Sequence, residues 1–467
     1  MRERLISGLT LSVLLAVVAG SVRASGLPSE EHARRASSAG VSAEWAARAP
    51  WFVFEVDTDH DTGQHVSVAV DPYGYYGGTY VSYYDVTYQD LRVAHFTASG
   101  GNCGPDDSWH CHTVDSGGDV GTYSSVAARA GGVNVSYHDA TNGDLKWAES
   151  TDYPYHQTWR VRTVERGSIP AKTGLYTSLA LPSYGSPRIS YHYSDPSGDD
   201  ALKMAAYSGA GGNCGQGEHA GKWRCKPVRA GEGVGEFTSL ALDEDWIRYI
   251  AYYDRAADDL WVATNETGSN CGPGGNTWTC YPVSGSGSDV GKYASIYVDD
   301  ASRFHMAYYD DTTNTLMYAT EVGSGGNCGI LGSAQCDAIE GMPEDYHAVG
   351  ISMAEDAAGY PVIAYQGEYG SLKIARPLDA LGMPPGAGNC GPEVGLFATW
   401  YCETVDPYVS KFSFSYRNGD YASIAVSPAG LATIAYYRVY THVEPDDGNL
   451  VIARQRVQVY LPLVMRN

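Results

Sequence analysis

The chain has 467 residues and a formal net charge of -23 at pH 7, because 54 acidic side chains outnumber 31 basic ones. An acidic surface repels nucleic acid and anionic membranes, which excludes most proteins that bind either one, and it attracts cations. Past the N-terminus, no segment approaches the ~20 apolar residues that a membrane span requires.

The first 24 residues have the pattern of a secretory signal peptide. Arginines precede an apolar run at 9–18 and then small residues up to Ala24, which is the order found in a cleavable export signal. We therefore expect a protein that is secreted, either extracellular or at the cell surface. Residues 25–49 are small and polar and are predicted to be a disordered lead-in.

A repeated unit follows. Each copy predicts a short strand with a small residue in its middle, a Tyr-rich strand, a turn rich in Asp, Asn, Gly and Thr, and a strand ending in Ala. A Gly-rich loop and a strand of the type W-x-C-x-T-V-D complete it. The Tyr-rich strands of the seven copies, about 59 residues apart on average, start at Ser82, Ser136, Ser190, Ala251, Ala307, Ala364 and Ala435.

Four strands in each of seven units predict an all-β, seven-bladed propeller over residues 50–457, followed by a tail at 458–467. The first strand of each unit should line the central channel. Its Ser and Ala residues suit that place, because bulky side chains would collide where seven strands converge.

The ring closure is predicted from the two ends of the repeat region. The last unit lacks its Trp-x-Cys strand, whereas WFVFEVD at 51–57 precedes the first unit and matches WYCETVD at 400–406. The N-terminal strand should therefore complete the last blade, which removes the exposed sheet edge of an open ring.

Ten cysteines in an exported chain are expected to be oxidised. They form five neighbouring couples, and a zinc site would usually need CxxC-type spacing, which does not occur. We predict one local disulfide per couple and none in the second blade, where Val161 stands at the Cys position. The couples are Cys103 with Cys111, Cys214 with Cys225, Cys271 with Cys280, Cys328 with Cys336, and Cys390 with Cys402.

Units such as SDVGKYASIYVDDASRFHMAYYDDTTNTLMYA at 288–319 resemble repeats of exported bacterial propellers that are grouped loosely with sialidase-like and lectin-like proteins. The resemblance covers about residues 51–457 and implies the fold. Sialidase repeats carry an Asp-box, S-x-D-x-G-x-T-W, of which no proper copy occurs, so no catalytic residue is carried over from that family.

Candidate ligand-binding residues lie on the face where the hairpins and the loops between blades meet. Two interpretations are open for the Asp that ends the Tyr-rich strand: a cap of an Asx-turn, which we favour because the motif repeats, or a ligand contact. His138 and His192 replace the second Tyr of their motifs, so they are candidates for specificity or structural groups. The acidic candidates are Asp85, Asp139, Asp254 and Asp310.

The segment DTDHDTG at 57–63 is a candidate calcium loop. Asp57, Asp59 and Asp61 alternate, and carboxylate oxygens suit a hard cation. The Gly is one place late for the usual calcium loop and position twelve is Val68, so a solvated acidic loop remains the alternative.

These features favour a non-catalytic, monomeric binding module for a glycan or a cell-surface protein, with calcium as its candidate cofactor and no other. Exposed Tyr stacks on sugar rings, and the chain has 37 Tyr but only 8 Phe. The alternative is a carbohydrate-active enzyme, a sialidase-like glycosidase or a polysaccharide lyase, since lyases on propellers use His and Tyr as acid and base. Fold alone does not separate the two.

Overall fold

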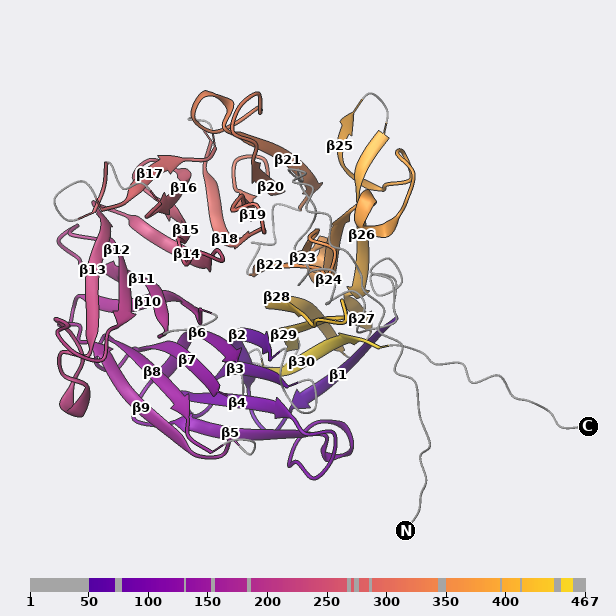
Figure 1. The fold of residues 1–467 in the computed structure, drawn as a ribbon. Helices are drawn as coiled ribbons and strands as arrows, with labels where there is room; N and C mark the ends of the chain where they lie inside the picture. Colours follow the sequence, from indigo (N-terminus) through magenta and orange to yellow (C-terminus); the bar gives the residue numbers. More distant parts are fainter. Residues whose placement is uncertain are drawn as a thin grey trace, which may run out of the picture.

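The computed structural model describes residues 50–456, except 72–77, 130–131, 153–155, 183–185, 267–269, 273–276, 285–287, 343–349, 395–396, 412–413 and 441–446. Within these residues the strands form seven antiparallel sheets arranged in a ring (Figure 1). The predicted seven-bladed propeller is therefore confirmed. The predicted signal peptide, lead-in and C-terminal tail lie outside the described residues. In the described part of the chain, no helix is both long and apolar enough to span a membrane.

Blades 1 to 5 each take four strands in sequence order. Blade 1 contains β2 (Thr62–Val70), β3 (Thr79–Asp85), β4 (Asp90–Phe96) and β5 (Trp109–Asp115); blade 2 contains β6 (Val120–Arg129), β7 (Gly132–Asp139), β8 (Asp144–Ser150) and β9 (Trp159–Glu165); blade 3 contains β10 (Lys172–Ala180), β11 (Arg188–Ser194), β12 (Ala201–Tyr207) and β13 (Trp223–Ala230); blade 4 contains β14 (Val234–Leu242), β15 (Arg248–Asp254), β16 (Asp259–Thr264) and β17 (Thr279–Pro282); blade 5 contains β18 (Val290–Val298), β19 (Phe304–Asp310), β20 (Thr315–Glu321) and β21 (Ala334–Gly341).

Blades 6 and 7 each add a short fifth strand. Blade 6 contains β22 (Ile351–Glu355), β23 (Pro361–Gly367), β24 (Ser371–Pro377), β26 (Phe397–Asp406) and the added β25 (Cys390–Val394); blade 7 contains β28 (Phe414–Val426), β29 (Ala432–Tyr440), β30 (Asp447–Gln455), β1 (Trp51–Asp57) and the added β27 (Val409–Lys411). Short 3-10 helices occupy several loops: η1 (Pro105–Asp107), η2 (Gly217–His219), η4 (Ile330–Gly332), η5 (Glu368–Gly370) and η6 (Leu378–Leu381).

The N-terminal strand closes the ring, as predicted. Strand β1 pairs antiparallel with β30, in a register running from Trp51 opposite Gln455 to Asp57 opposite Leu450. In Figure 1 the indigo β1 lies beside the yellow β30. Val56 of β1 is 3% exposed and packs with residues of blades 7 and 1. The two ends of the propeller thus share one sheet.

A ring of serine contacts joins the seven inner strands. In every blade a Ser of the inner strand accepts a hydrogen bond from a backbone N–H of the next blade's inner strand, at 2.9–3.2 Å. The acceptors are Ser67, Ser125, Ser178, Ser239, Ser295, Ser352 and Ser423, and the last of them binds Val68 of blade 1. The small residue in the middle of each predicted strand is therefore an interblade link.

Removing one of these links should destabilise the ring measurably. Ser178→Ala takes away the acceptor of the Leu240 N–H, 3.0 Å away, and Leu240 is buried. A buried donor left without a partner costs about 1–3 kcal/mol, so we expect a loss of that size in the free energy of unfolding, measured by urea denaturation. The exposed loop variant Ser116→Ala should change it by less than about 0.5 kcal/mol.

Large side chains line the channel, which corrects the expectation that they would collide there. His65, Tyr123, Tyr176, Phe237, Tyr293 and Tyr421 border a cavity of about 210 Å³, with neighbouring ring centroids 4.6–4.7 Å apart. Each has a left-handed φ of 50–56° within a segment where the register of the inner strand shifts. Blade 6 has Gly350 at this position, where a Cβ would lie 2.4 Å from the Ala422 nitrogen.

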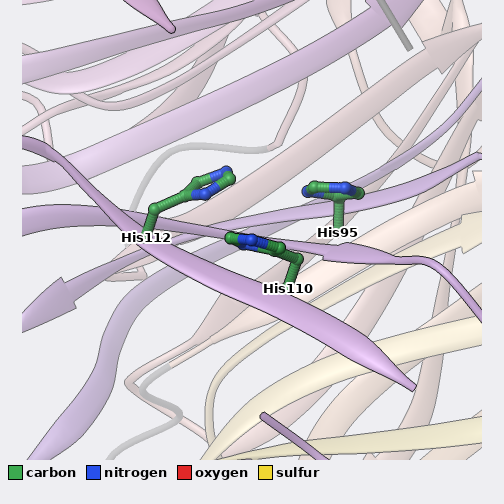
Figure 2. Close-up of side chains that lie close together, drawn as sticks. All are labelled: His95, His110 and His112. Atoms are coloured by element: carbon green, nitrogen blue, oxygen red, sulfur yellow. The ribbon is translucent and has the colours of Figure 1, made fainter. Parts of the chain in front are cut away.

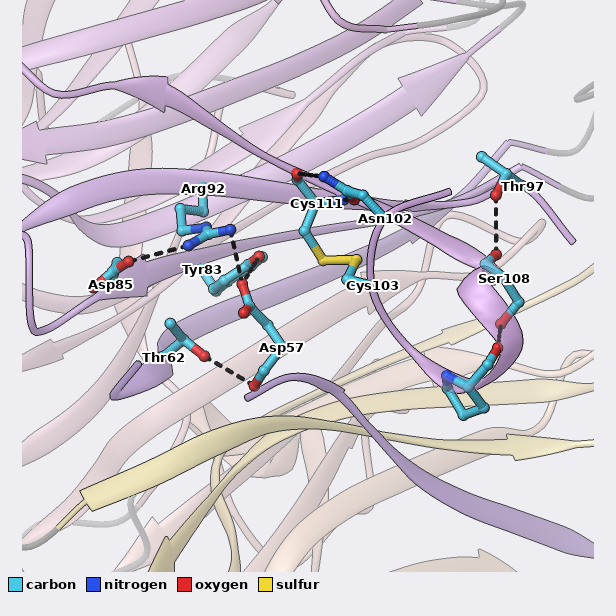
Figure 3. The surroundings of a disulfide bond; sticks show 11 residues. Asp57, Thr62, Tyr83, Asp85, Arg92, Thr97, Asn102, Cys103, Ser108 and Cys111 are labelled. Atoms are coloured by element: carbon cyan, nitrogen blue, oxygen red, sulfur yellow. Dashed lines mark hydrogen bonds and ion pairs between the residues drawn. A yellow bond between two sulfur atoms is a disulfide. The ribbon is translucent and has the colours of Figure 1, made fainter. Parts of the chain in front are cut away.

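In five blades the first Tyr of the repeated motif donates to a carboxylate of the preceding blade. Tyr83 donates to Asp57 at 2.6 Å, and Arg92 forms ion pairs with Asp57 and Asp85 (Figure 3). The same arrangement of tyrosine, carboxylate and cation occurs at four other blade junctions, formed by Tyr137–Asp115–Lys146, Tyr191–Glu165–Lys203, Tyr365–Glu340–Lys373 and Tyr436–Asp406–Arg438.

All ten cysteines are paired, in the five local couples predicted from the sequence. In blades 1, 3, 4 and 5 the disulfide ties the loop after the third strand to the fourth strand, and in blade 6 it ties β25 to β26. The Asn before the first Cys supports it: Asn102 accepts from the Cys111 N–H at 2.7 Å and donates to the Cys111 carbonyl at 3.0 Å (Figure 3). Disulfides of this density are typical of proteins that fold in an oxidising compartment.

Candidate functional site

The predicted acidic residues at the ends of the Tyr-rich strands are structural caps. Asp85, Asp139, Asp254 and Asp310 are 1–8% exposed. Asp85 accepts from the Tyr88 N–H at 3.0 Å, and equivalent turn contacts occur in the other three. The structure thus shows the Asx-turn interpretation directly, and it places the four carboxylates in four different blades rather than in one site.

The two histidines proposed for specificity are also held by the fold. His138 donates from Nδ1 to the Thr173 carbonyl at 2.8 Å, and His192 donates to the Val234 carbonyl at 3.0 Å. Both are 2–3% exposed. Burial lowers the pKa of His192 to about 4 and also lowers that of His138. Each ring therefore links its blade to the next in the neutral state.

The three aspartates of the candidate calcium loop lie in different environments. Asp57 is buried against Tyr83 and Arg92, whereas Asp59 is exposed. Asp61 accepts from the Tyr437 hydroxyl at 2.6 Å, and burial raises its pKa. They are not among the groups of described residues whose ligand atoms lie close enough together to share a metal ion. Calcium at this loop stays a prediction.

The two large cavities lie between blades, on the edge that carries the loops after the first and third strands. This is the edge opposite the face predicted from the sequence. The blade 5–6 pocket has a volume of about 780 Å³, and the blade 2–3 pocket has a volume of about 630 Å³. Both volumes fall in the usual range for small-molecule sites.

The blade 5–6 pocket combines an aromatic floor with polar walls. The Tyr318 and Trp400 rings lie edge to face, 5.0 Å apart, and Tyr360 and several prolines line the cavity beside them. On the polar side, the Gln335 amide donates to Asp337 at 3.0 Å. Both of these side chains are half-buried, so they remain accessible to a ligand.

The blade 2–3 pocket also combines aromatic and polar side chains, but more of its lining residues are charged. Trp147 and Tyr207 line it, and the Trp147 indole N–H donates to the Asn134 side-chain oxygen at 3.1 Å. Two ion pairs form its charged wall: Arg160 with Glu149, at 2.9 Å, and Arg162 with Glu218.

Different residue types occupy the equivalent positions of the repeat that lie between blades. The residues before and after Cys in the W-x-C-x strand, and the residue opposite on the third strand, vary among units. They are Glu149, Arg160 and Arg162 in blade 2, Thr320, Gln335 and Asp337 in blade 5, and His95, His110 and His112 in blade 1. Sequence reasoning missed them, although the variable x positions beside an almost constant Trp and Cys were the available signal.

No protein-family model matches the chain, and no curated protein matches it. Several solved structures are similar to it. A lectin of Aleuria aurantia, solved with Fucα1-6GlcNAc, is 14% identical, with 74% of this chain and 97% of that chain covered and a TM-score of 0.40. An α-L-arabinofuranosidase of Fusarium graminearum is 9% identical, with 86% and 96% covered and a TM-score of 0.40. An endosialidase of phage phi92 is 10% identical, with 90% and 71% covered and a TM-score of 0.42.

Proposed function

We propose that this protein is a secreted glycan-binding propeller whose ligands occupy pockets between the blades. The observation that carries the proposal is the pair of large cavities at corresponding blade junctions, each with aromatic side chains beside carboxylate, amide and guanidinium groups. Aromatic rings offer a flat apolar surface to a sugar ring, and the few convergent polar groups can bind its hydroxyls.

The blade 5–6 pocket suits neutral glycans better than anionic ones. Asp299, Asp337 and Asp379 line the blade 5–6 pocket, against a single guanidinium from Arg303. The chain as a whole carries a formal charge of -23. A sialylated or sulfated sugar would be repelled from this pocket, whereas the hydroxyls of a neutral sugar can donate to its carboxylates.

The contacts of the pocket acids favour binding over catalysis. A glycosidase uses two carboxyl groups, one as acid and one as base or nucleophile, across the scissile bond. In the blade 2–3 pocket Glu149 and Glu218 are each ion-paired with an arginine. In the blade 5–6 pocket Asp299 is held by Arg303 and by His305. The charges of these three acids are matched by Arg160, Arg162 and Arg303.

A substitution in the blade 5–6 pocket tests the proposal. Wild-type mature protein is applied to an array of neutral and sialylated glycans, and the affinity for the retained sugars is then measured by calorimetry. Asp337→Asn should weaken the affinity of this pocket about 10-fold or more, because a hydrogen bond to a charged group contributes about 1.5–3 kcal/mol. Because the Asp337 side chain is half-buried, the melting temperature of the Asp337→Asn variant should be nearly that of the wild type.

The charge-matched control is Asp245→Asn, in an exposed turn of blade 4, which should bind like the wild type. Retention of no glycan, or an equal loss of affinity in both variants, would contradict the proposal. Sugars released into the supernatant would instead support the carbohydrate-active enzyme. A parallel series with a calcium chelator tests whether the loop at Asp57, Asp59 and Asp61 assists binding.

A further inference from the structure

Three histidines meet at the junction of blades 1 and 2. One nitrogen of each of His95, His110 and His112 lies within 4.8 Å of the others. The ring centroids of His110 and His112 are 4.6 Å apart, and the His95 ring lies 5.5 Å from His110 and 5.4 Å from His112. Figure 2 shows the three imidazoles gathered together.

The local strand geometry explains the cluster. His110 and His112 are two residues apart on β5, so both project from the same face of the sheet. His95 is directly opposite His110 on β4. The intervening Cys111 and the preceding Trp109 project to the other face, where Cys111 is in a disulfide and Trp109 is completely buried. The core contacts of these two residues therefore fix the direction of the histidines.

Each of the three rings has a buried nitrogen without a hydrogen-bond partner among the described residues: Nδ1 of His95, Nδ1 of His110 and Nε2 of His112. His95 is only 5% exposed. Buried polar atoms are nearly always paired, and leaving one unpaired is costly. Three such nitrogens in one cluster could together bind a metal ion, because neutral imidazole nitrogens are common ligands of zinc and other transition metals.

The surroundings hold the rings without competing for these nitrogens. The other nitrogen of His110, Nε2, lies 3.2 Å from the Gln157 side-chain nitrogen. When Nδ1 binds a metal, Nε2 carries the proton, and the Gln157 amide turns over so that its oxygen accepts that proton. His156 closes one side, with its ring nitrogens engaged by Tyr80 at 3.1 Å and Ser150 at 2.9 Å.

We propose that His95, His110 and His112 form a binding site for a transition-metal ion of the Zn²⁺ class. Three imidazoles at about 2.0–2.1 Å from the ion leave one position of a tetrahedron free. Nitrogens bound in this way are about 3.4 Å apart, so the rings need to move inward by about 1 Å. The corresponding residues of blade 2 form an Arg160–Glu149 ion pair instead, which makes blade 1 distinct.

Zn²⁺ alone is the probe. Untagged full-length mature protein, dialysed against a chelator and then against buffer, is titrated with ZnSO₄ by calorimetry, and with Co²⁺ while the visible spectrum is recorded. We expect one equivalent of Zn²⁺, an intense tetrahedral Co²⁺ absorption that Zn²⁺ displaces, and a higher melting temperature with Zn²⁺. His110→Gln and His112→Gln should each weaken binding at least 100-fold.

The matched control is His60→Gln, a histidine in the loop before β2, which should bind Zn²⁺ like the wild type. Because a variant can also lose its fold, the melting curve of each metal-free protein is recorded, and the two cluster variants should melt like the wild type. The proposal is overturned if no stoichiometric binding occurs, if both cluster variants keep it, or if His60→Gln loses it equally.

Discussion

Deleting residues 51–57 should lower the melting temperature by at least about 6 °C, because a loss above about 5 kcal/mol is expected from several simultaneous defects. Strand β30 would lose its partner and become an exposed sheet edge, which favours aggregation. Val56 would leave the core between blades 7 and 1.

The same deletion removes one of the two carboxylate partners of Arg92 in blade 1 and of Arg438 in blade 7. Asp57 accepts from Tyr83 and pairs with Arg92. Glu55 forms an ion pair with Arg438 at 2.8 Å. Since both arginines are largely buried, the loss of a carboxylate partner is costly. Loss of the latch should therefore disturb blades 1 and 7 together, which hydrogen exchange can locate.

A deletion of the same length at 30–36, before the described residues, is the control and should leave the melting temperature unchanged. Adding a synthetic peptide of residues 50–58 to the latch-deleted protein should restore part of the lost stability, because the peptide can pair with β30. An unchanged melting temperature in the 51–57 deletion would contradict the role of β1.

Arg92→Ala should lower the free energy of unfolding by about 3–5 kcal/mol, the usual cost of removing one partner of a buried ion pair. Arg92 lies 3.2 Å from Asp57 and 3.3 Å from Asp85, and the side chains of these acids are only 2% and 1% exposed. The substitution leaves two buried carboxylates without a cation. Urea denaturation at pH 7 measures the change.

Arg160→Ala is the matched control. It removes an arginine from an ion pair with Glu149, but here the arginine side chain is 51% exposed. Exposed pairs contribute about 0–1 kcal/mol, so the expected loss is below that limit. Combining Arg92→Ala with Asp57→Asn should cost less than the two single changes added together, because the double variant buries one charge fewer. Equal losses for Arg92→Ala and Arg160→Ala would contradict the buried network.

The architecture could be predicted from the sequence alone, because the same strand and turn pattern occurs seven times along the chain. Hairpin turns, the small Ser of the inner strand and the neighbouring cysteines each specify pairings within a short segment. Even the long-range closure could be predicted, since WFVFEVD at 51–57 is a displaced copy of the fourth strand. The Tyr-Tyr-Asp motif was rightly interpreted as part of the scaffold, although its partners in the preceding blade were not anticipated.

The candidate sites depended on tertiary structure, for a physical reason. A pocket between blades is formed by side chains of two units, such as Tyr318 of blade 5 and Trp400 of blade 6, and no local pattern relates them. His95 joins His110 and His112 only through the β4–β5 register. The repeated sequence by itself determined the fold of this protein. The few non-repeated residues form a pocket or a histidine cluster only where folding brings neighbouring strands and blades together.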